Sequence, residues 1–284
     1  MQRLGPQDAS FLHLEDAVTH MHVGAVALLE GPLPSYEELA GRIWANLPHV
    51  PRYRQRVHFV PLALGRPVWV DDPHFNLAYH LRRTALPEPG GDEQLQLLVG
   101  RVMSQQLDRH KPLWEMWMIE GLSDGRRALG AAHQTPPLDG RRGFGSRASV
   151  GDPGQEPEPE LPEPGEWWPE RQPAGAELAG RALLERASSP YELVHGVRSA
   201  LRSPRQTAAM AAGTAQGLLT MRGILRPTPS SSLNGPVGPH RRWDWARSRL
   251  SDVKRVRSAF GGTVNDVVHS AIAGGFRELP GGTR

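Results

Sequence analysis

The chain contains no cysteine, and this absence excludes several kinds of chemistry at once. Disulfide bonds, thiolate metal sites and a cysteine nucleophile are all ruled out. The absence is also compatible with a reducing cytosol, and we expect a cytoplasmic protein.

Long apolar runs are missing as well. No stretch approaches the ~18 consecutive apolar residues of a membrane-spanning helix, so no segment is expected to cross a bilayer. The opening, "MQRLGPQDASFLHLED", has no apolar core after a basic start and does not resemble a signal peptide. Any association with a membrane would have to be peripheral, through an amphipathic face or an apolar patch.

Concentrated positive charge is the third feature that the sequence lacks. The net charge is only +3, and the arginines are scattered instead of forming a basic block. Nucleic-acid-binding domains gather such charge on one face and carry a recognisable reading motif. Neither feature is found, so we expect no nucleic-acid partner.

What is present indicates a folded chain that alternates strands and helices. The chain has 284 residues, enough for one large domain or two modest ones, and its eight tryptophans are untypical of disorder. Ser35 followed by Glu38 forms a capping box for a helix whose apolar stripe includes Trp44. Asp92 is expected to cap a second helix. We expect strands over 19–31, 75–86 and 112–122, a hairpin over 54–72, and helices over 35–47 and 92–107. This mixture predicts an α/β or α+β fold.

The second half is organised differently. Residues 130–151 show neither helical nor strand periodicity, and 151–175 are rich in proline, glutamate and glycine, as expected for a linker. Helical patterns return over 175–188 and 191–222, and prolines punctuate a loop over 226–243. Two more helices are expected, one capped by Ser251 and one with Thr263 as its N-cap.

Four stretches together resemble the bacterial wax ester synthase/acyl-CoA:diacylglycerol acyltransferase family. They are "DASFLHLEDAVTHMHVGAVALLEGP", "PLWEMWMIEGL", "LNGPVGPHRRW" and "GGTVNDVVHSAIAGG", and they occur in the family's order across nearly the whole chain. The resemblance implies the CoA-dependent acyltransferase (chloramphenicol acetyltransferase-like) fold of α/β class. It implies an N-terminal domain over 1–150, a linker with connecting helices over 151–225, and the beginning of a truncated second domain over 226–284.

The resemblance also implies a chemistry. Family members transfer a fatty acyl group from acyl-CoA to diacylglycerol or a long-chain alcohol, with acyl-CoA as co-substrate and no bound cofactor or metal. The reaction needs a base for the hydroxyl proton, and in the family this base is the second histidine of an HHxxxDG motif. The aspartate of the motif is structural. A cytoplasmic location, with peripheral association with the inner membrane face or lipid inclusions, is implied too.

In this chain the motif departs from the family pattern. Asp139 and Gly140 match its end, but counting back without gaps puts Gln134 and Thr135 at the two histidine positions. Neither side chain titrates near neutral pH, so neither can serve as a base. His133 can take the position only if one or two residues are inserted before Asp139. It is either that displaced base or a solvated loop histidine.

The composition of this stretch suggests a cause. Residues 128–151 consist largely of glycine, arginine, alanine, proline and serine, the residues that GC-rich DNA encodes when it is read in a shifted frame. Family-like sequence resumes at Asp152. Two compensating insertions or deletions would explain the damaged motif. An intact HHxxxDG in another reading frame of the coding DNA would establish this, and its absence from all frames would disprove it.

Other candidates lie outside the motif. Asn265 matches the family's asparagine near the reaction centre, where it would orient the acceptor or the thioester, and it could equally be a local cap. His240, Arg241 and Arg242 could bind CoA phosphates, because arginine suits phosphate geometry, or could be solvated surface charge.

Two pairs of residues have structural interpretations. His20 and His22 are expected on one face of the strand, and without a third ligand nearby they favour a structural role over a metal site. Trp114 and Trp117 are expected in the core or in a tunnel wall.

The resemblance therefore predicts an acyl-CoA:diacylglycerol O-acyltransferase or wax ester synthase. Its predicted catalytic-site residues are His133, Asp139, Gly140 and Asn265. The alternative is a catalytically inactive lipid- or CoA-binding remnant of the family, which the altered histidine positions favour. A condensation domain of the same superfold is a third interpretation, and the "PLW" and "LNGPVGP" stretches argue against it.

Overall fold

The structure is a computed structural model that describes residues 2–29, 34–123, 125, 127–133, 167–185 and 235–278. The chain divides into two compact units, one of residues 1–195 and 238–243 and the other of 196–237 and 244–284. Each unit is treated by itself. The predicted domain limits at 150 and 225 stay predictions.

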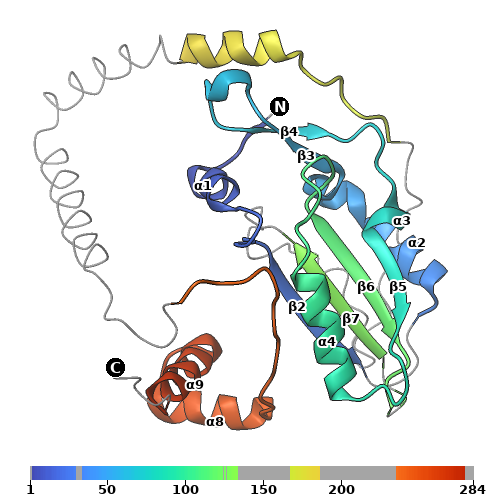
Figure 1. Cartoon of the computed structure of the whole chain (residues 1–284), viewed down its shortest axis with the longest axis vertical. Coiled ribbons are helices and arrows are strands. Elements are labelled where there is room, and N and C mark those ends of the chain that lie inside the picture. Colours follow the sequence, from blue (N-terminus) through green and yellow to red (C-terminus); the bar gives the residue numbers. More distant parts are fainter. Residues whose placement is uncertain are drawn as a thin grey trace, which may run out of the picture. The chain divides into compact units, whose positions relative to one another are not determined.

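A four-stranded mixed sheet forms the centre of the first unit (Figure 1). Its order is β2-β7-β6-β5, in which β7 is antiparallel to both of its neighbours and β5 is parallel to β6. The strands are β2 (Val23–Leu29), β5 (Leu81–Ala85), β6 (Trp114–Glu120) and β7 (Arg127–His133). The strands expected within 19–31 and 112–122 are confirmed over 23–29 and 114–120.

One face of this sheet packs against α2 (Tyr36–Asn46). Alternate residues of β6 point to this face, so Trp114, Met116 and Met118 are buried against Leu39 and Ile43 of the helix. The predicted capping box is present, because the backbone N–H of Glu38 donates to the Ser35 hydroxyl and Glu38 accepts from the backbone N–H of Ser35.

The opposite face is covered by α4 (Asp92–Met103), which buries Leu95, Leu98 and Val99 (Figure 1). The predicted cap is one residue off, because Gly91 is the N-cap and its backbone N–H donates to the Gln94 side chain at 2.9 Å. Asp92 is the first helical residue, where a carboxylate still interacts favourably with the helix dipole.

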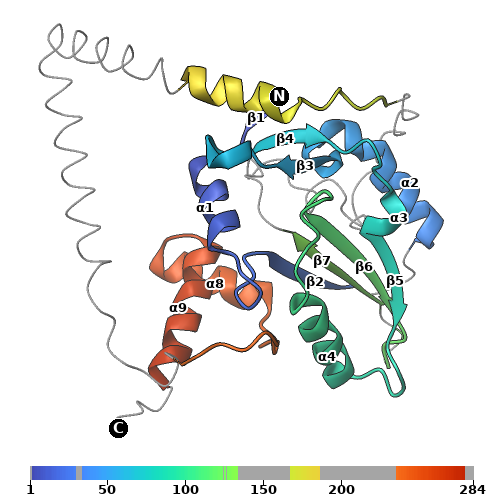
Figure 2. The same ribbon diagram turned by 45° about the horizontal axis from the view of Figure 1, so that its top comes forward.

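A smaller antiparallel sheet of order β1-β4-β3 lies beside the first (Figure 2). It confirms the predicted hairpin, since β3 and β4 pair directly. Helix α1 and the helix over residues 175–185 contribute to its two cores: Leu12 packs with Val57 and Trp69, and Leu178 packs with Val68 and Val70. The remaining elements are β1 (Gln2–Arg3), α1 (Pro6–Leu14), β3 (Gln55–His58), β4 (Val68–Asp71) and the 3-10 turns Leu47–His49, Pro51–Arg54 and Pro61–Ala63.

The second unit contributes two described helices, α8 (Leu250–Phe260) and α9 (Val264–Glu278). Ser251 is not the cap of α8, because it lies within the first turn and Arg249 occupies the N-cap position. Thr263 caps α9 as predicted: the Asp266 backbone N–H donates to its hydroxyl, and its own backbone N–H donates to the Asp266 carboxylate at 2.7 Å. Asp266 therefore braces the helix start.

Three further expectations need correction. Residues 77–80 form a helical turn, α3 (Leu77–His80), ahead of β5, because Asn76 accepts a hydrogen bond from the backbone of Ala78 and starts a turn. Residues 130–133 belong to β7 although they lack alternation, because strand pairing on both sides holds small residues extended. Trp44, expected on the apolar stripe of α2, is 37% exposed.

Among the helices in the described part of the chain, none is both long enough and apolar enough to span a bilayer.

Two leucines of α4 provide a matched test of this packing. Leu95 is 1% exposed and Leu97 is 68% exposed. We predict that Leu95→Ala lowers the free energy of unfolding by about 2–5 kcal/mol, because it leaves a cavity in a close-packed core. Leu97→Ala should change it by less than about 0.5 kcal/mol. Urea denaturation of both variants measures this, and equal losses would contradict the placement of α4.

Candidate active site

The end of β7 is where the sequence places the family's histidine motif. His133 is the last residue of this strand, and its backbone is paired with Val23 of β2 and Trp114 of β6. Asp139 and Gly140 lie outside the described residues, as does the His133 side chain. Their proposed roles therefore stay predictions, but the strand that leads into the motif is held on both sides.

An aromatic cluster supports the partner strand at this point. Trp114 is buried in the core as expected, and its indole N–H donates to the Tyr53 carbonyl at 2.9 Å. The His80 ring stacks on Trp114 with centroids 4.6 Å apart and is 2.8 Å through Nδ1 from the Trp114 carbonyl oxygen. Burial lowers the pKa of His80 to about 4. The ring is therefore neutral near pH 7, and Nδ1 donates to the carbonyl.

A second buried histidine lies on the other side of β7. His22 immediately precedes β2 and is 7% exposed, with a ring hydrogen bond to the Met103 backbone. Its Nδ1 has no hydrogen-bond partner among the described residues. Burial lowers the pKa of His22, and the neighbouring His20 acts in the same direction. The result is a neutral imidazole close to the end of β7.

The loop that carries His22 is tied to the protein by a buried carboxylate. The Glu15 side chain pairs with Arg109, with 2.8 Å between Oε2 and Nη2, and accepts from the backbone N–H of Met21. His20 and His22 stack with centroids 5.6 Å apart, although both lie ahead of the strand instead of on it. In the described part of the chain, no group of three or more histidine or carboxylate side chains could hold a metal ion.

The segment over residues 238–243 lies along α4. The Arg241 backbone N–H donates to the Ser104 hydroxyl at 2.7 Å, and the Arg241 guanidinium donates to the carbonyls of Gly238 and Val18. Arg241 thus positions the segment. His240 and Arg242 are exposed, and the CoA contacts predicted for all three stay predictions.

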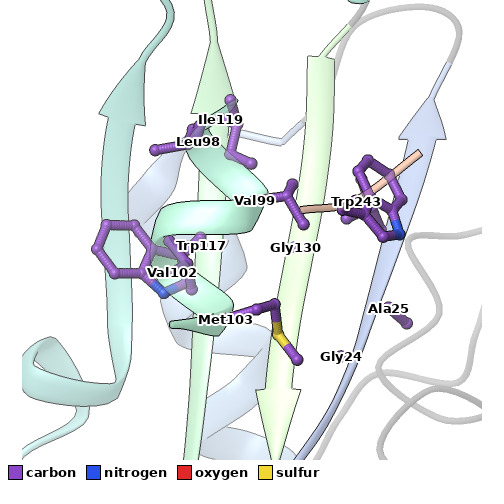
Figure 3. A pocket seen from close by; sticks show the side chains of 11 residues that line it. Gly24, Ala25, Leu98, Val99, Val102, Met103, Trp117, Ile119, Gly130 and Trp243 are labelled. Atoms are coloured by element: carbon purple, nitrogen blue, oxygen red, sulfur yellow. The ribbon is translucent and has the colours of Figure 1, made fainter. Parts of the chain in front are cut away.

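An apolar cavity of about 120 Å³ lies between α4 and the sheet (Figure 3). Trp117 lies on its β6 side and Trp243 on its β2 side (Figure 3). A tunnel-wall role for Trp117 stays a prediction. Glycine residues of the sheet widen it. Its lining residues are Gly24, Ala25, Val26, Leu98, Val99, Val102, Met103, Trp117, Ile119, Gly130 and Trp243.

Asn265 lies in the second unit, as the second residue of α9, and is exposed. Its neighbour Asp266 accepts from both the backbone and the hydroxyl of Thr263, which lowers the pKa of that carboxyl group. Asp266 is thus engaged in capping, while the Asn265 side chain is not the cap. A role for Asn265 with substrate stays a prediction.

Sequence reasoning missed three contributors to this region: Trp243, Gly100 and the buried state of His22. The "HRRW" run suggested charge binding, and only the crossing of this segment over α4 shows that its tryptophan lines a cavity. A Cβ atom at Gly100 would lie 2.7 Å from the Arg241 carbonyl oxygen. The glycine inside a helical pattern was the available signal for such a close approach.

A mixed sheet with α2 on one face and α4 on the other, and with β7 as a central strand that ends at His133, defines an acyltransferase-like α/β domain. Residues 4–268 match the family described as wax ester synthase/diacylglycerol acyltransferase catalytic domain. The chain belongs to this family, which decides against the condensation-domain interpretation.

Known proteins agree with this assignment. The chain is 38% identical over 262 residues to the probable diacylglycerol O-acyltransferase tgs3 of Mycobacterium tuberculosis, covering 91% of this chain and 96% of that protein. It is 33% identical over 283 residues to the probable diacylglycerol O-acyltransferase tgs1 of the same species, covering 98% of this chain and 58% of that one.

The structure is also similar to the solved wax ester synthase/diacylglycerol acyltransferase of Marinobacter aquaeolei VT8. The TM-score is 0.55 at 28% identity, over 94% of this chain and 57% of that chain. This chain thus matches tgs3 almost end to end and spans somewhat more than half of tgs1 and of the Marinobacter protein. The expected α/β acyltransferase fold is confirmed.

The buried His80 predicts a pH dependence of stability. Its pKa is lowered from 6.5 to about 4 in the folded protein, so the unfolded chain binds the proton more readily between these values. Stability should therefore fall as the pH drops from 6.5 towards 4, by up to about 3 kcal/mol from this group. His80→Phe should flatten that part of the profile. Denaturation at several pH values measures the slope.

The exposed His49 is the matched control for this experiment. His49→Phe should retain the slope of the unsubstituted protein, whatever it does to absolute stability. An unchanged slope in His80→Phe would show that another group carries the pH dependence.

The close approach at Gly100 gives a second prediction. Gly100→Ala should displace residues 238–243 from α4 and cost about 1–3 kcal/mol of unfolding free energy, because the added methyl group meets a backbone carbonyl. Tryptic cleavage after Arg241 and Arg242 should become faster. Gly41→Ala, where a Cβ atom meets nothing within 4 Å, should leave the cleavage unchanged. Equal rates in both variants would refute the contact.

Proposed function

We propose that the protein transfers a fatty acyl group from acyl-CoA to the hydroxyl of diacylglycerol or a long-chain alcohol, giving triacylglycerol or wax ester. The observation that carries this proposal is family membership over residues 4–268. The relatives tgs3 and tgs1, both named probable diacylglycerol O-acyltransferases, support the diacylglycerol acceptor.

The chemistry requires a base and a means of stabilising charge. The acceptor hydroxyl attacks the thioester carbonyl as the base removes its proton, and the tetrahedral oxyanion then collapses with cleavage of the C–S bond. The proton held by the base passes to the departing CoA thiolate. We assign the base to His133, because it ends β7 and is the histidine nearest in the sequence to Asp139 and Gly140.

The remaining candidates take the roles that the family implies for them. Asp139 and Gly140 would hold the motif loop, with Asp139 as a structural carboxylate. Asn265 would orient the acceptor or the thioester through its carboxamide. His240 and Arg242 are exposed and would bind phosphates of CoA, whereas Arg241 already donates to backbone carbonyls. We further propose a cytoplasmic protein that binds the inner membrane face or lipid inclusions peripherally, where its lipid substrates reside.

A second candidate function has its own observation. Gln134 and Thr135 occupy the ungapped histidine positions, and neither can accept a proton near pH 7. This favours a protein that binds acyl-CoA or lipid without catalysing transfer.

One assay separates these functions. Purified protein is given labelled acyl-CoA with diacylglycerol or hexadecanol, and the labelled neutral lipid is counted. We predict turnover that falls about 10²- to 10⁴-fold in His133→Ala, the range that a general base contributes. His49→Ala, which alters an exposed histidine, serves as the control.

The outcomes that contradict the prediction are distinct. Turnover retained by His133→Ala would remove this residue as the base. Acyl-CoA binding without any turnover of the unsubstituted protein would establish the non-catalytic function instead.

A further inference from the structure

The cavity between α4 and the sheet is lined by apolar side chains and glycines. Its volume of about 120 Å³ is close to that of an engineered apolar cavity of ~150 Å³ that stays dry and binds benzene. A cavity of this size and character suits a short stretch of hydrocarbon, not a polar group.

The register of the sheet places one end of the cavity next to the end of β7, where the backbone of His133 lies. Gly24, a lining residue, pairs with Ala132, and the preceding residue Val23 pairs with His133. From there the lining continues past Gly130 to Ile119, which pairs with Ala128. The cavity therefore extends along β7 away from the strand end at which the reaction is proposed to occur.

A polar side chain, His22, lies near the same end of the cavity. His22 precedes Val23 and is bonded through its ring to the backbone of Met103, a lining residue. This buried imidazole has an unpartnered Nδ1 among the described residues. A molecule with a polar head near β7's end and an apolar tail towards Ile119 would match this polarity.

We propose that the cavity binds the aliphatic chain of a substrate, and that Gly130 and Val102 determine how much of that chain it accepts. This inference rests on the proposed function for the choice of a lipid substrate. This aliphatic chain is that of the acyl donor or that of the alcohol acceptor, which share the same hydrocarbon chemistry.

Two substitutions change the cavity in opposite directions. A Cβ atom at Gly130 would lie 3.5 Å from Ile119 Cδ1 and 3.8 Å from Trp117 Cβ, so Gly130→Ala fits without a clash and narrows the cavity. Val102→Ala removes two methyl groups from the α4 side and enlarges it. Gly41→Ala adds a methyl group where nothing lies within 4 Å and serves as the matched control.

The experiment measures binding, which does not depend on turnover. Calorimetry on the full chain compares butanoyl-, octanoyl- and palmitoyl-CoA in one series and 1-butanol, 1-octanol and 1-hexadecanol in the other. Gly130→Ala should weaken the long members of one series by on the order of tenfold relative to its shortest member, the typical effect of one methylene in an apolar pocket. Val102→Ala should shift the preference towards longer chains, and Gly41→Ala should leave it unchanged.

The ligand series whose binding changes identifies which substrate supplies the aliphatic chain. A change confined to the CoA esters assigns the cavity to the acyl donor, and one confined to the alcohols assigns it to the acceptor. If the substitutions change the chain-length dependence of binding but the protein shows no turnover, the binding site is supported and the proposed function is wrong. If neither series binds, or if Gly130→Ala and Val102→Ala alter only thermal stability, the cavity is a packing gap and the inference is overturned.

Discussion

The double pairing of β7, with β2 on one side and β6 on the other, is the constraint on which the rest of the first unit depends. Between Arg127 and His133 the strand consists of small or apolar residues, 128–132, which have little packing preference of their own. Backbone hydrogen bonds along both edges compensate for this, because a central strand satisfies its N–H and C=O groups on two sides. This pairing fixes the end of the strand at His133.

The same small residues determine what can lie next to the strand. Gly130 and Gly24 present no side chain to α4, so helix and sheet enclose a cavity at this point. Gly100, on α4, lets the backbone of Arg241 approach more closely than any side chain would allow. Trp243 reaches the cavity because of that approach. Glycines distant in the sequence thus cooperate in one region.

The buried polar groups near the strand end share a common electrostatic state. Burial lowers the pKa of both His22 and His80, so both rings are neutral near pH 7. The one buried carboxylate in this loop, Glu15, is paired with Arg109. Among the described residues, these polar groups are therefore either neutral or paired with an opposite charge.

The sequence by itself determined the local elements and the family. Strand alternation in 114–118, the capping box at Ser35, the N-cap at Thr263 and the four family-like stretches required no knowledge of contacts. It could not reveal that 130–133 is a strand, that Arg241 binds carbonyls, or that Trp243 lines a cavity. These depend on partners far away in the chain, and a strand without periodicity is recognised only by its neighbours. Local helix and strand preferences depend on adjacent residues. Strand pairing and close backbone contacts form between distant residues, and only when the chain is folded.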